Sequence, residues 1–504
     1  MIPGAPILAI ILPLIGGFLT PLVNILAKRW NHPRIRDYFV LGASVGALLL
    51  VVSMAKSVWG GEFLIYQLAG RTPPWGINLA VDGLNLLAAL IASGMSVLVI
   101  IYSMVFMNRK DGLSKYYTLL LLVTAGMLGV ALTGDIFNLY VFFEIMSISS
   151  YALVAFTRSK LSIEASIKYL IVGTLGTAFI LLGVALLYGL TGTLNIADLA
   201  GRIAAINASA GGTPFIVMVA LGLFVTGFGI KIAMIPLHAW LPDAYQGAPS
   251  PVATIMAGGT AVIGVYAMIR VTYLLFGALA VGSLFVGLGL VTMIVGALMA
   301  LMQQDLKRLL AYSGISQMGY ILLGIGLGTA LGIEGGLFHM LNNAIYKALL
   351  FMCAGAVILR VGTSNMDKLG GLAEKMPITT VFFGIGALAI SGVPPFNGFA
   401  SKWTIYVAGI NAGQPIFTVI AVIISALTLA YFLKAFSSVF LGQRPKRFDN
   451  VKEVPVVMLF PMCLLAVLCI VLGVLPSLGM SVVGPARDGL LSQLHYIQSV
   501  LGGA

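Results

Sequence analysis

The chain has 504 residues, of which 60% are hydrophobic and only 9% are charged, and its mean hydropathy is +1.06. This composition is typical of a polytopic membrane protein and excludes a soluble fold with one large core. The formal net charge of +12 would raise the question of nucleic acid in a soluble protein. Here the basic residues fall mainly in short loops between apolar runs, which is the pattern of the positive-inside rule.

Few side chains could hold a redox cofactor or a metal. The cysteines lie in apolar runs without a CxxC pair, at Cys353, Cys463 and Cys469. An iron–sulfur cluster, a zinc site or a disulfide framework is therefore not expected. Of the histidines, only His238 and His339 fall in expected membrane segments, so a haem core of paired histidines is not expected either. We expect no cofactor and no metal in this chain.

Fourteen apolar segments are long enough to cross a bilayer, and the loops between them are short. Their approximate ranges are 5–27, 36–56, 80–106, 115–133, 135–156, 163–190, 214–240, 250–274, 277–302, 306–329, 333–359, 377–408, 416–440 and 454–476. We treat residues 1–504 as a single membrane domain. The first run ends at Lys28-Arg29 and is interpreted as a membrane helix rather than a cleavable signal.

Two further helices are expected at the membrane surface. Residues 196–212 form a short polar-flanked segment between the sixth and seventh spans. In residues 480–504, apolar side chains recur at helical spacing, which predicts an amphipathic helix lying on the membrane.

The loop charges predict the orientation. If the N-terminus lies outside the cell membrane, most basic loop residues fall inside. The outer loops then hold only Lys56, Arg71, Arg202, Arg270 and Arg487. A missed or extra helix would disturb this alternation, so we expect a multi-pass protein with both termini on the outer side.

One glutamate and several lysines lie within the expected spans. Glu144 is near the centre of segment 135–156, and the lysines are Lys168, Lys231, Lys347, Lys402 and Lys434. An ionised side chain at membrane depth costs about 2.5–3.5 kcal/mol on insertion scales, so it should face protein or water. A desolvated lysine can hold or release a proton, whereas an arginine stays charged.

These groups indicate a proton relay through Glu144, Lys231, Lys347 and Lys402. The alternative for Glu144 is a protonated carboxyl packed against a neighbouring helix. For Lys168, the alternative is an i,i+4 pair with Glu164 on a wet helix end.

Prolines interrupt the seventh and twelfth spans. Pro236 follows Lys231 by five residues, and Pro394 and Pro395 precede Lys402. Proline removes a helical hydrogen bond and clashes with the preceding turn. Irregular backbone at membrane depth is tolerated only within protein or beside a watery cavity. Broken helices in corresponding positions of two halves are typical of inverted-repeat transporters.

The breaks leave backbone carbonyls that need donors. In the twelfth span they are the carbonyls of Ile390 and Ser391. His238 lies at the break of the seventh span, where a structural role as a donor competes with a role in the proton path.

Aspartates mark several span ends. Asp82 and Asp305 precede apolar runs and are predicted to be helix caps. Asp135 and Asp243 fit a helix cap or loop anchor as well as they fit part of an ion entrance.

Six stretches together resemble one known family. They are VDGLNLL (81–87), GDIFNLYVFFEIMSISSYALVAF (134–156), KIAMIPLHAWLPDAYQGAPSPV (231–252), QDLKRLLAYSGISQMGYILLG (304–324), LFHMLNNAIYKALLFMCAGAV (337–357) and SGVPPFNGFASKW (391–403). They look like the antiporter-like subunits shared by complex I and by multisubunit Mrp-type Na⁺/H⁺ antiporters. The similarity runs from the third to the thirteenth span. It looks nearest to the Mrp D subunit and to its relatives in archaeal membrane-bound hydrogenase and sulfur-reducing complexes.

The resemblance implies an all-α membrane fold of fourteen helices with two inverted five-helix repeats, at about 115–275 and 277–440. The implied function is proton translocation, within a redox-linked respiratory complex that keeps its redox centres in other chains. The implied partners are the other membrane subunits of such a complex.

The resemblance also implies residue roles. Glu144 and Lys231 match the glutamate and lysine of the first half-channel. Lys347 matches the basic residue of the eleventh helix, and Lys402 the residue that ends the second half-channel. His339 falls where the family often has a histidine in its central polar axis.

The chain departs from the family at the eighth helix. Members often carry a bridging lysine before a GVYA-like run, but here residues 260–263, around Val262, are TAVI. Asn343 stands where some relatives have a second histidine. A proton path between the halves would then rely on water, His238, Thr260 or Lys347.

Other functions compete with this one. The chain could be the D subunit of a stand-alone Mrp-type Na⁺/H⁺ antiporter, an inert membrane scaffold, a redox chain that binds quinone or metal, or a carrier for an organic solute. A scaffold leaves the deep charges unexplained, and the sequence has no cluster, haem or nucleotide motif. The residues leave open whether the ion is H⁺, Na⁺ or both.

Overall fold

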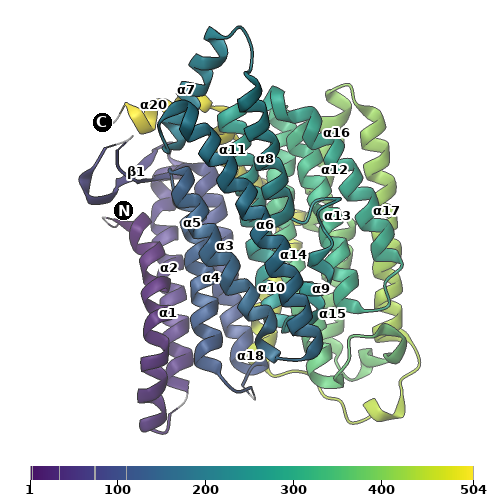
Figure 1. Cartoon of the computed structure of the whole chain (residues 1–504). Helices are drawn as coiled ribbons and strands as arrows, with labels where there is room; N and C mark the ends of the chain where they lie inside the picture. Colours follow the sequence, from purple (N-terminus) through teal and green to yellow (C-terminus); the bar gives the residue numbers. More distant parts are fainter. Residues whose placement is uncertain (1, 3, 33, 73–74, 109, 503–504) are drawn as a thin grey trace.

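The computed structural model describes residues 2, 4–32, 34–72, 75–108 and 110–502. It is a bundle of long helices that run between two opposite ends of the molecule (Figure 1). Among the described residues, 12 helices are long and apolar enough to cross a membrane. Two shorter apolar helices, Phe215–Lys231 and Pro377–Ser391, belong to the seventh and twelfth expected spans. The chain is therefore a multi-span membrane protein, and both termini lie near the same end of the bundle (Figure 1).

The helices follow the expected spans closely because each apolar run buries one face against its neighbours. In the first part of the chain the helices are α1 Ala5–Arg29, α2 Arg34–Trp59, α3 Gly83–Phe106, α4 Leu113–Leu132, α5 Ile136–Val154, α6 Lys160–Thr191, α7 Ile196–Ser209, α8 Phe215–Lys231, α9 Trp240–Gly247, α10 Ser250–Ile255 and α11 Ala261–Phe276. In the second part they are α12 Ala278–Leu301, α13 Leu306–Gly326, α14 Ala330–Val361, α15 Pro377–Ser391, α16 Asn397–Asn411, α17 Pro415–Phe436, α18 Val456–Val474, α19 Pro476–Leu491 and α20 Gln493–Leu501. The expected surface helix at 196–212 corresponds to α7.

The same backbone arrangement occurs at the start of α5 and at the start of α13. Asp135 forms an isolated antiparallel bridge with Asn195, and Asp305 forms one with Asn365. In each case the amide after the aspartate donates to the residue before the asparagine, from Ile136 to Leu194 and from Leu306 to Ser364. The two bridges lie at opposite ends of the bundle (Figure 1). This arrangement is what an inverted repeat would produce, because α5 and α13 run in opposite directions.

The aspartates at the span ends cap their helices. Asp82 accepts hydrogen bonds from the amides of Leu84 and Asn85 and forms a capping box at α3. Asp135 caps α5, and Asp305 caps α13. The predicted caps at Asp82 and Asp305 are thus confirmed, and Asp135 is a cap as well.

Both proline-rich breaks are present. Residues 232–239 separate α8 from α9, and residues 392–396 separate α15 from α16. At the first break, the indole N–H of Trp240 donates to the carbonyl of Ile230 at 2.9 Å. The indole thus adds to the backbone bond that this carbonyl accepts from the amide of Ala233 at 3.1 Å.

Two elements were not expected from the sequence. A hairpin forms from β1 Leu64–Gln67 and β2 Asn78–Val81, which pair antiparallel with Leu64 opposite Val81. A π-helical turn at Met256–Thr260 joins α10 to α11. There Gly258 lets the backbone approach α14, since a Cβ would lie 3.0 Å from the carbonyl oxygen of Ala344.

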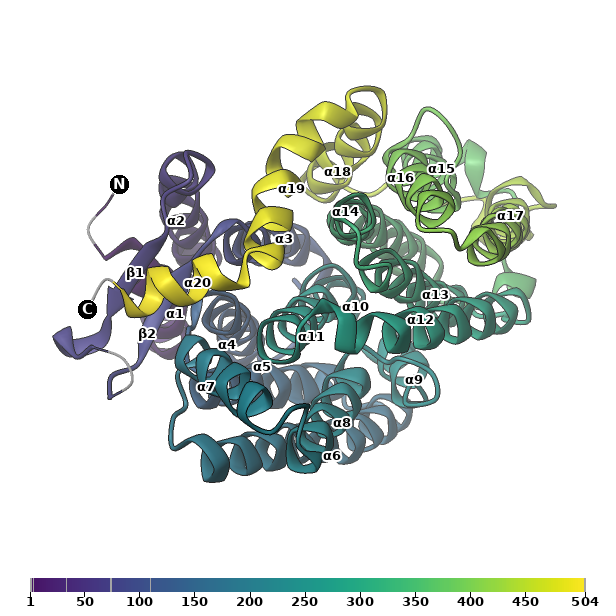
Figure 2. The same cartoon turned by 90° about the horizontal axis from the view of Figure 1, so that it is seen from above.

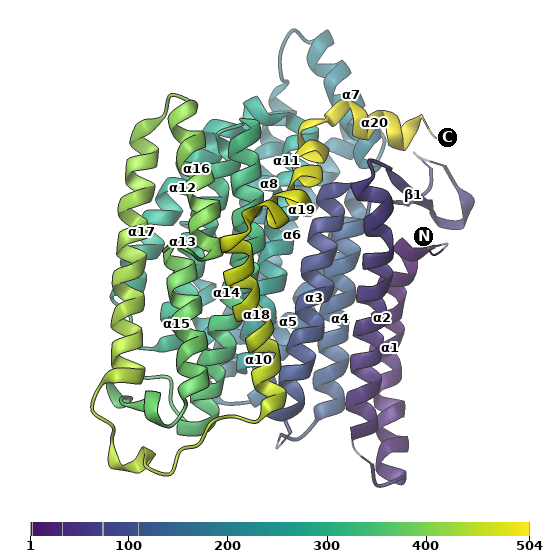
Figure 3. The same ribbon diagram turned by 180° about the vertical axis from the view of Figure 1, so that it is seen from behind.

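The C-terminal stretch differs from the expected single surface helix at 480–504. It forms two helices, α19 and α20, which meet at Ser492. Figure 3 shows α19 lying across the bundle, where it contacts α3 and α14, and Figure 2 shows α20 beside α7. Leu490 and Val500 are buried, whereas Leu494 is exposed. Only part of the apolar face is therefore covered by protein, since Leu491 is also exposed.

Arg270 is not an outer-loop residue, and its placement among the outer-loop charges was wrong. It lies in α11 with 2% of its surface exposed, and its guanidinium contacts both carboxylate oxygens of Asp82 at 2.5 and 2.6 Å. It also donates to the side chain of Asn85 at 2.7 Å. Arg270 lies near the end of its expected span, which suggested a loop residue. In the structure its buried acidic partner is Asp82, at the start of α3.

Candidate proton-translocation site

Lys231 and Glu144 come together on the first half of the bundle. Lys231 is the last residue of α8 and is buried, and its Nζ donates to Ser147 Oγ at 2.9 Å and to the Tyr151 hydroxyl at 3.4 Å. Glu144, Ser147 and Tyr151 lie on α5 at spacings of three and seven residues, so they share one helix face. Glu144 is near enough to interact electrostatically with Lys231.

Glu144 itself is only half-buried. It has no hydrogen bond or ion pair to any residue that the structure describes. The exposed side chains beside it on α5 are apolar: Phe137, Val141 and Ile148 are 42%, 36% and 57% exposed. A carboxylate within an exposed apolar stripe at membrane depth needs a cover or a partner.

Lys347 lies at the middle of the bundle, on α14, and is 1% exposed. Its Nζ donates to the carbonyl of Leu310 at 2.6 Å and to the hydroxyl of Ser313. Both acceptors belong to α13. They hold the ammonium in the protein interior with no acidic side chain bonded to it among the described residues.

A cavity of about 10 Å³ lies between the two halves. It is lined on one side by Ile232 and Tyr245 and on the other by Asn343 and Lys347. Neither polar atom of the fully buried Asn343 side chain has a hydrogen-bond partner among the described residues. A cavity of this size is at the lower limit for one water, and buried water commonly satisfies such groups.

His339 and Lys402 are joined in the second half. His339 is fully buried on α14, with Nδ1 2.9 Å from Ser401 Oγ and Nε2 3.1 Å from Gln317 Oε1. Lys402 follows Ser401 on α16, and its Nζ lies 4.5 Å from the centre of the Tyr320 ring. The Tyr320 ring also packs against His339, with ring centres 5.5 Å apart.

The break before α16 supplies acceptors to this group. Lys402 Nζ donates to the carbonyl of Ile390 at 2.9 Å and to Ser425 Oγ at 3.0 Å. Ser425 in turn donates to the carbonyl of Ser391 at 2.8 Å. The carbonyls that Pro394 and Pro395 were expected to free are the ones bonded here, so that expectation is confirmed.

Lys168 lies apart from the buried amines. Its side chain is 49% exposed and pairs with Glu164 and with Asp243, each at 2.9 Å. Asp243 also binds Arg308 at 2.6 Å. The i,i+4 pair expected as the alternative for Lys168 is therefore present, within a surface network that joins α6, α9 and α13.

Asp243 lies beyond the expected seventh span. Burial alone would raise the pKa of this carboxyl, but hydrogen-bonded ion pairs with Lys168 and Arg308 outweigh burial and hold the pKa below its usual value. Of the interpretations that the sequence left open for Asp243, the contacts fit a loop anchor.

His238 lies at the break before α9 and is half-buried. Its Nδ1 is 3.4 Å from the carbonyl of Pro236, and its ring is 6.2 Å from that of Tyr312. These contacts fit the structural role considered for His238. The cavity beside Lys347 is lined by other residues.

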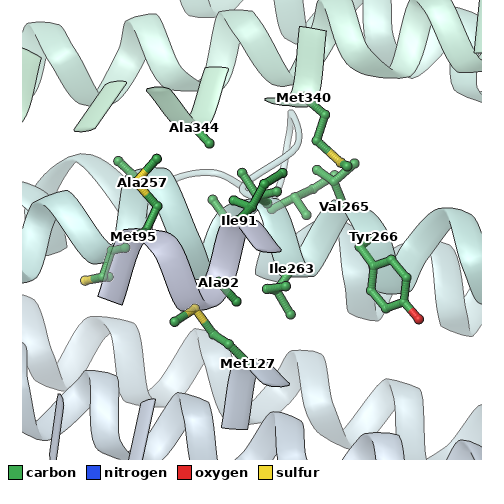
Figure 4. Packing of buried hydrophobic residues seen from close by; sticks show 14 of the residues in the cluster. Ile91, Ala92, Met95, Met127, Ala257, Ile263, Val265, Tyr266, Met340 and Ala344 are labelled. Atoms are coloured by element: carbon green, nitrogen blue, oxygen red, sulfur yellow. The ribbon is translucent and has the colours of Figure 1, made fainter. Parts of the chain in front are cut away.

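The region that lacks the bridging lysine is packed with apolar side chains. Figure 4 shows Met95, Met127, Ala257, Ile263 and Met340 among the buried apolar side chains of this part of the core. Val262 is fully buried, and Thr260 donates to the carbonyl of Met256 at 3.2 Å. The cavity lined by Asn343 and Lys347 borders this region, since Ala257 and Ala261 also line it.

Sequence reasoning missed the hydroxyl, ring and amide partners of the charged groups. Ser147 and Tyr151 had a usable signal, because they share a helix face with Glu144. No sequence pattern links the charged groups to Gln317, Tyr320 or Ser425, because these partners lie on other helices.

The broken helices and the buried lysines that meet them define an antiporter-like membrane protein. The chain belongs to the family described as NADH:quinone oxidoreductase/Mrp antiporter, whose model matches residues 133–428. A second model, described as the N-terminus of chain 5 of NADH-ubiquinone oxidoreductase (complex I), matches residues 74–117.

Relatives of this chain come from both branches of that family. It is 38% identical to the N subunit of NADH-quinone oxidoreductase from Desulforudis audaxviator, over 93% of this chain and 95% of the relative. It is 32% identical to the D subunit of the Na⁺/H⁺ antiporter from Alkalihalophilus pseudofirmus, over 98% and 99%. Among solved structures, a chain of the archaeal membrane-bound sulfane sulfur reductase matches with a TM-score of 0.89 and 34% identity, over 98% of this chain and 99% of that one.

Proposed function

We propose that this chain is the proton-translocating component of a multisubunit respiratory complex that is driven by a redox reaction elsewhere. The observation that carries the proposal is the series of buried amines, Lys231, Lys347 and Lys402, each bonded only to neutral acceptors among the described residues. Holding a charge in such a place is costly, so these amines are suited to gaining and losing protons.

The proposed relay begins at Glu144. An ionised Glu144 favours protonated Lys231, and two opposite charges about 10 Å apart attract by about 1.7 kcal/mol at an effective dielectric near 20. If a cation on a neighbouring membrane protein of the complex draws Glu144 away, Lys231 loses that support and releases its proton toward Lys347. The cavity at Asn343 holds the connecting water, and His339 passes the proton on to Lys402.

The partner implied by this scheme is another membrane subunit that covers the α5 stripe around Glu144. The half-exposed carboxylate supports this, because lipid alone would leave it unsatisfied. Both termini are proposed to lie on the outer side, and no redox centre is proposed in this chain. An absorption spectrum of the isolated chain and protease access to the C-terminus in sealed vesicles test these two points.

The proposal is tested with Glu144→Gln in sealed vesicles containing the whole complex. We expect coupled proton movement to be lost while the complex assembles and its redox activity persists. Glu374→Gln, which removes an exposed carboxylate that pairs with Arg444, is the matched control and should pump normally. Wild-type pumping by the Glu144 variant would overturn the relay.

A second candidate function is that of the D subunit in a stand-alone Mrp-type Na⁺/H⁺ antiporter. The 32% identity to such a protein over nearly the whole chain supports it. The proteins that co-purify with the chain separate the two functions. A partner that carries a nickel–iron centre or an iron–sulfur cluster indicates redox-driven pumping, whereas its absence indicates an antiporter. Replacing Na⁺ by K⁺ in the vesicle assay shows which ion moves.

A further inference from the structure

A second polar site lies at the end of the bundle opposite the termini, where α4 begins and α5 ends. It is a cavity of about 600 Å³ between the start of α4, the end of α5 and the start of α6. None of the groups in the proposed relay lines it. The cavity is therefore distinct from the residues of the proposed relay.

The rim of this cavity is strongly cationic. Lys110, Lys115 and Arg158 line it together with Asp111, which leaves an excess of positive charge. None of the three cations forms an ion pair with a described residue. Cations that stabilise a loop would be expected to form ion pairs with carboxylates.

The start of α4 adds to this charge. Gly112 precedes the helix and provides no side-chain cap, so the first amides of α4 lack a side-chain acceptor. The N-terminus of a helix of 20 residues carries a partial positive charge and binds anions. Gly112 and Lys115 both line the cavity, so this N-terminus and the ammonium groups act on the same space.

Much of the remaining lining is apolar and comes from α4, α5 and α6. Leu119, Ala152 and Ile163 line the cavity. Ile163 is 44% exposed. An elongated ligand thus fits with a charged group among the cations and a hydrocarbon chain against this apolar lining. A free inorganic anion would use only the first part.

We propose that this cavity, defined by Lys110, Lys115, Arg158 and the start of α4, binds the phosphate headgroup of an anionic phospholipid of the adjoining leaflet. The lipid's acyl chains lie against Leu119, Ala152 and Ile163. Basic pockets between membrane helices are suited to such headgroups. The inference does not depend on the proposed function, because it would hold for an antiporter or a redox-driven pump alike.

The test is lipid binding to the purified full-length chain in detergent, followed by native mass spectrometry. Phosphatidylglycerol is titrated against wild-type protein and the double variant Lys115→Gln/Arg158→Gln. Each basic residue near a membrane contributes about five-fold in binding of anionic lipid. We expect phosphatidylglycerol to bind the double variant roughly 25-fold more weakly, and phosphatidylcholine to show no such difference.

The matched control is Lys28→Gln/Arg29→Gln. It removes the same charge at the same end of the bundle, at the end of α1 and away from the cavity. Equal losses in both double variants would overturn the proposal in favour of general surface attraction. Inorganic phosphate that displaces the lipid at equal concentration would show a free-anion site and would also overturn it.

A third variant leaves the charges intact. Ala152→Trp fills the apolar part of the cavity, so it should weaken phosphatidylglycerol binding while inorganic phosphate has no effect. Unfolding temperatures in detergent without lipid identify any variant that fails to fold, and the single variant Lys115→Gln then replaces the double one. Cross-linking of Lys115 to another protein in the intact complex would show a protein occupant and would contradict the lipid.

Discussion

Lys402 Nζ lies 2.9 Å from the carbonyl oxygen of Ile390, on the other side of the helix break that divides α15 from α16. The proline-rich break removes the backbone donor that this carbonyl would have in a helix. The amine replaces it and also lies over the Tyr320 ring. Lys402 therefore supports the break as well as serving the proposed relay, and substitutions can separate these two roles.

Lys402→Arg should keep the donor and lose the relay, because a guanidinium does not release its proton. Lys402→Met should lose both, and leaving a buried carbonyl unsatisfied costs about 1–3 kcal/mol. We expect a lower unfolding temperature for the Met variant and no proton transport in either. Lys434→Met, at an exposed lysine bonded to the carbonyl of Leu301, is the control. Transport by the Arg variant at the wild-type rate would contradict the prediction.

The buried pair of Arg270 and Asp82 predicts a large loss of stability when one partner is removed. Arg270→Gln leaves Asp82 buried without its counter-charge, and such a loss costs about 3–5 kcal/mol. The measurement is thermal unfolding in detergent. The double variant Arg270→Met/Asp82→Asn should recover part of the loss, since no lone charge remains. An unchanged unfolding temperature in the single variant would show that the pair contributes little.

Asn343 offers a substitution that should stabilise the fold while harming transport. Asn343→Leu has similar volume and removes two buried polar atoms that lack partners among the described residues. We expect the unfolding temperature to stay equal or rise. Transport should fall, because the cavity beside Lys347 loses the group that would hold water. Normal transport in this variant would place the connection between the halves elsewhere.

The surface network at Asp243 predicts a pH dependence of stability. Its folded pKa is depressed, because Lys168 and Arg308 together outweigh burial. The sign follows from linkage. The stability that ionised Asp243 adds to the folded state is complete above the unfolded pKa of about 4, and it is lost as the pH falls through the folded pKa. The unfolding temperatures of wild type and Asp243→Asn should therefore differ above about pH 4 and converge in acid. A constant difference across pH would exclude this role.

The sequence was sufficient for the membrane helices and their breaks, because both depend on local properties. Apolar runs set the spans, and Pro236, Pro394 and Pro395 set the interruptions. The family and the caps at Asp82 and Asp305 were also predicted correctly, and Lys231, Lys347 and Lys402 are buried as expected, whereas Lys168 is exposed. The number of spans and the extent of the two repeats remain predictions, as do the roles of the individual relay residues.

What the sequence could not provide was distant pairing. Arg270 and Asp82 lie 188 residues apart, so nothing local to Arg270 distinguishes a buried arginine from one at a loop. The hairpin of β1 and β2 was missed because each strand has only 4 residues. The hydroxyl and amide partners of the lysines likewise come from helices that are remote in the chain.

The paired bridges at Asp135–Asn195 and Asp305–Asn365 suggest the history of this chain. Such bridges would result if one ancestral segment was duplicated and the second copy was inserted in the opposite orientation. The same bridge would then occur once at each end of the bundle. The lysines and prolines of each copy would then diverge separately, while the two bridges would keep the same geometry. The shared geometry of the two bridges is what such a duplication would leave.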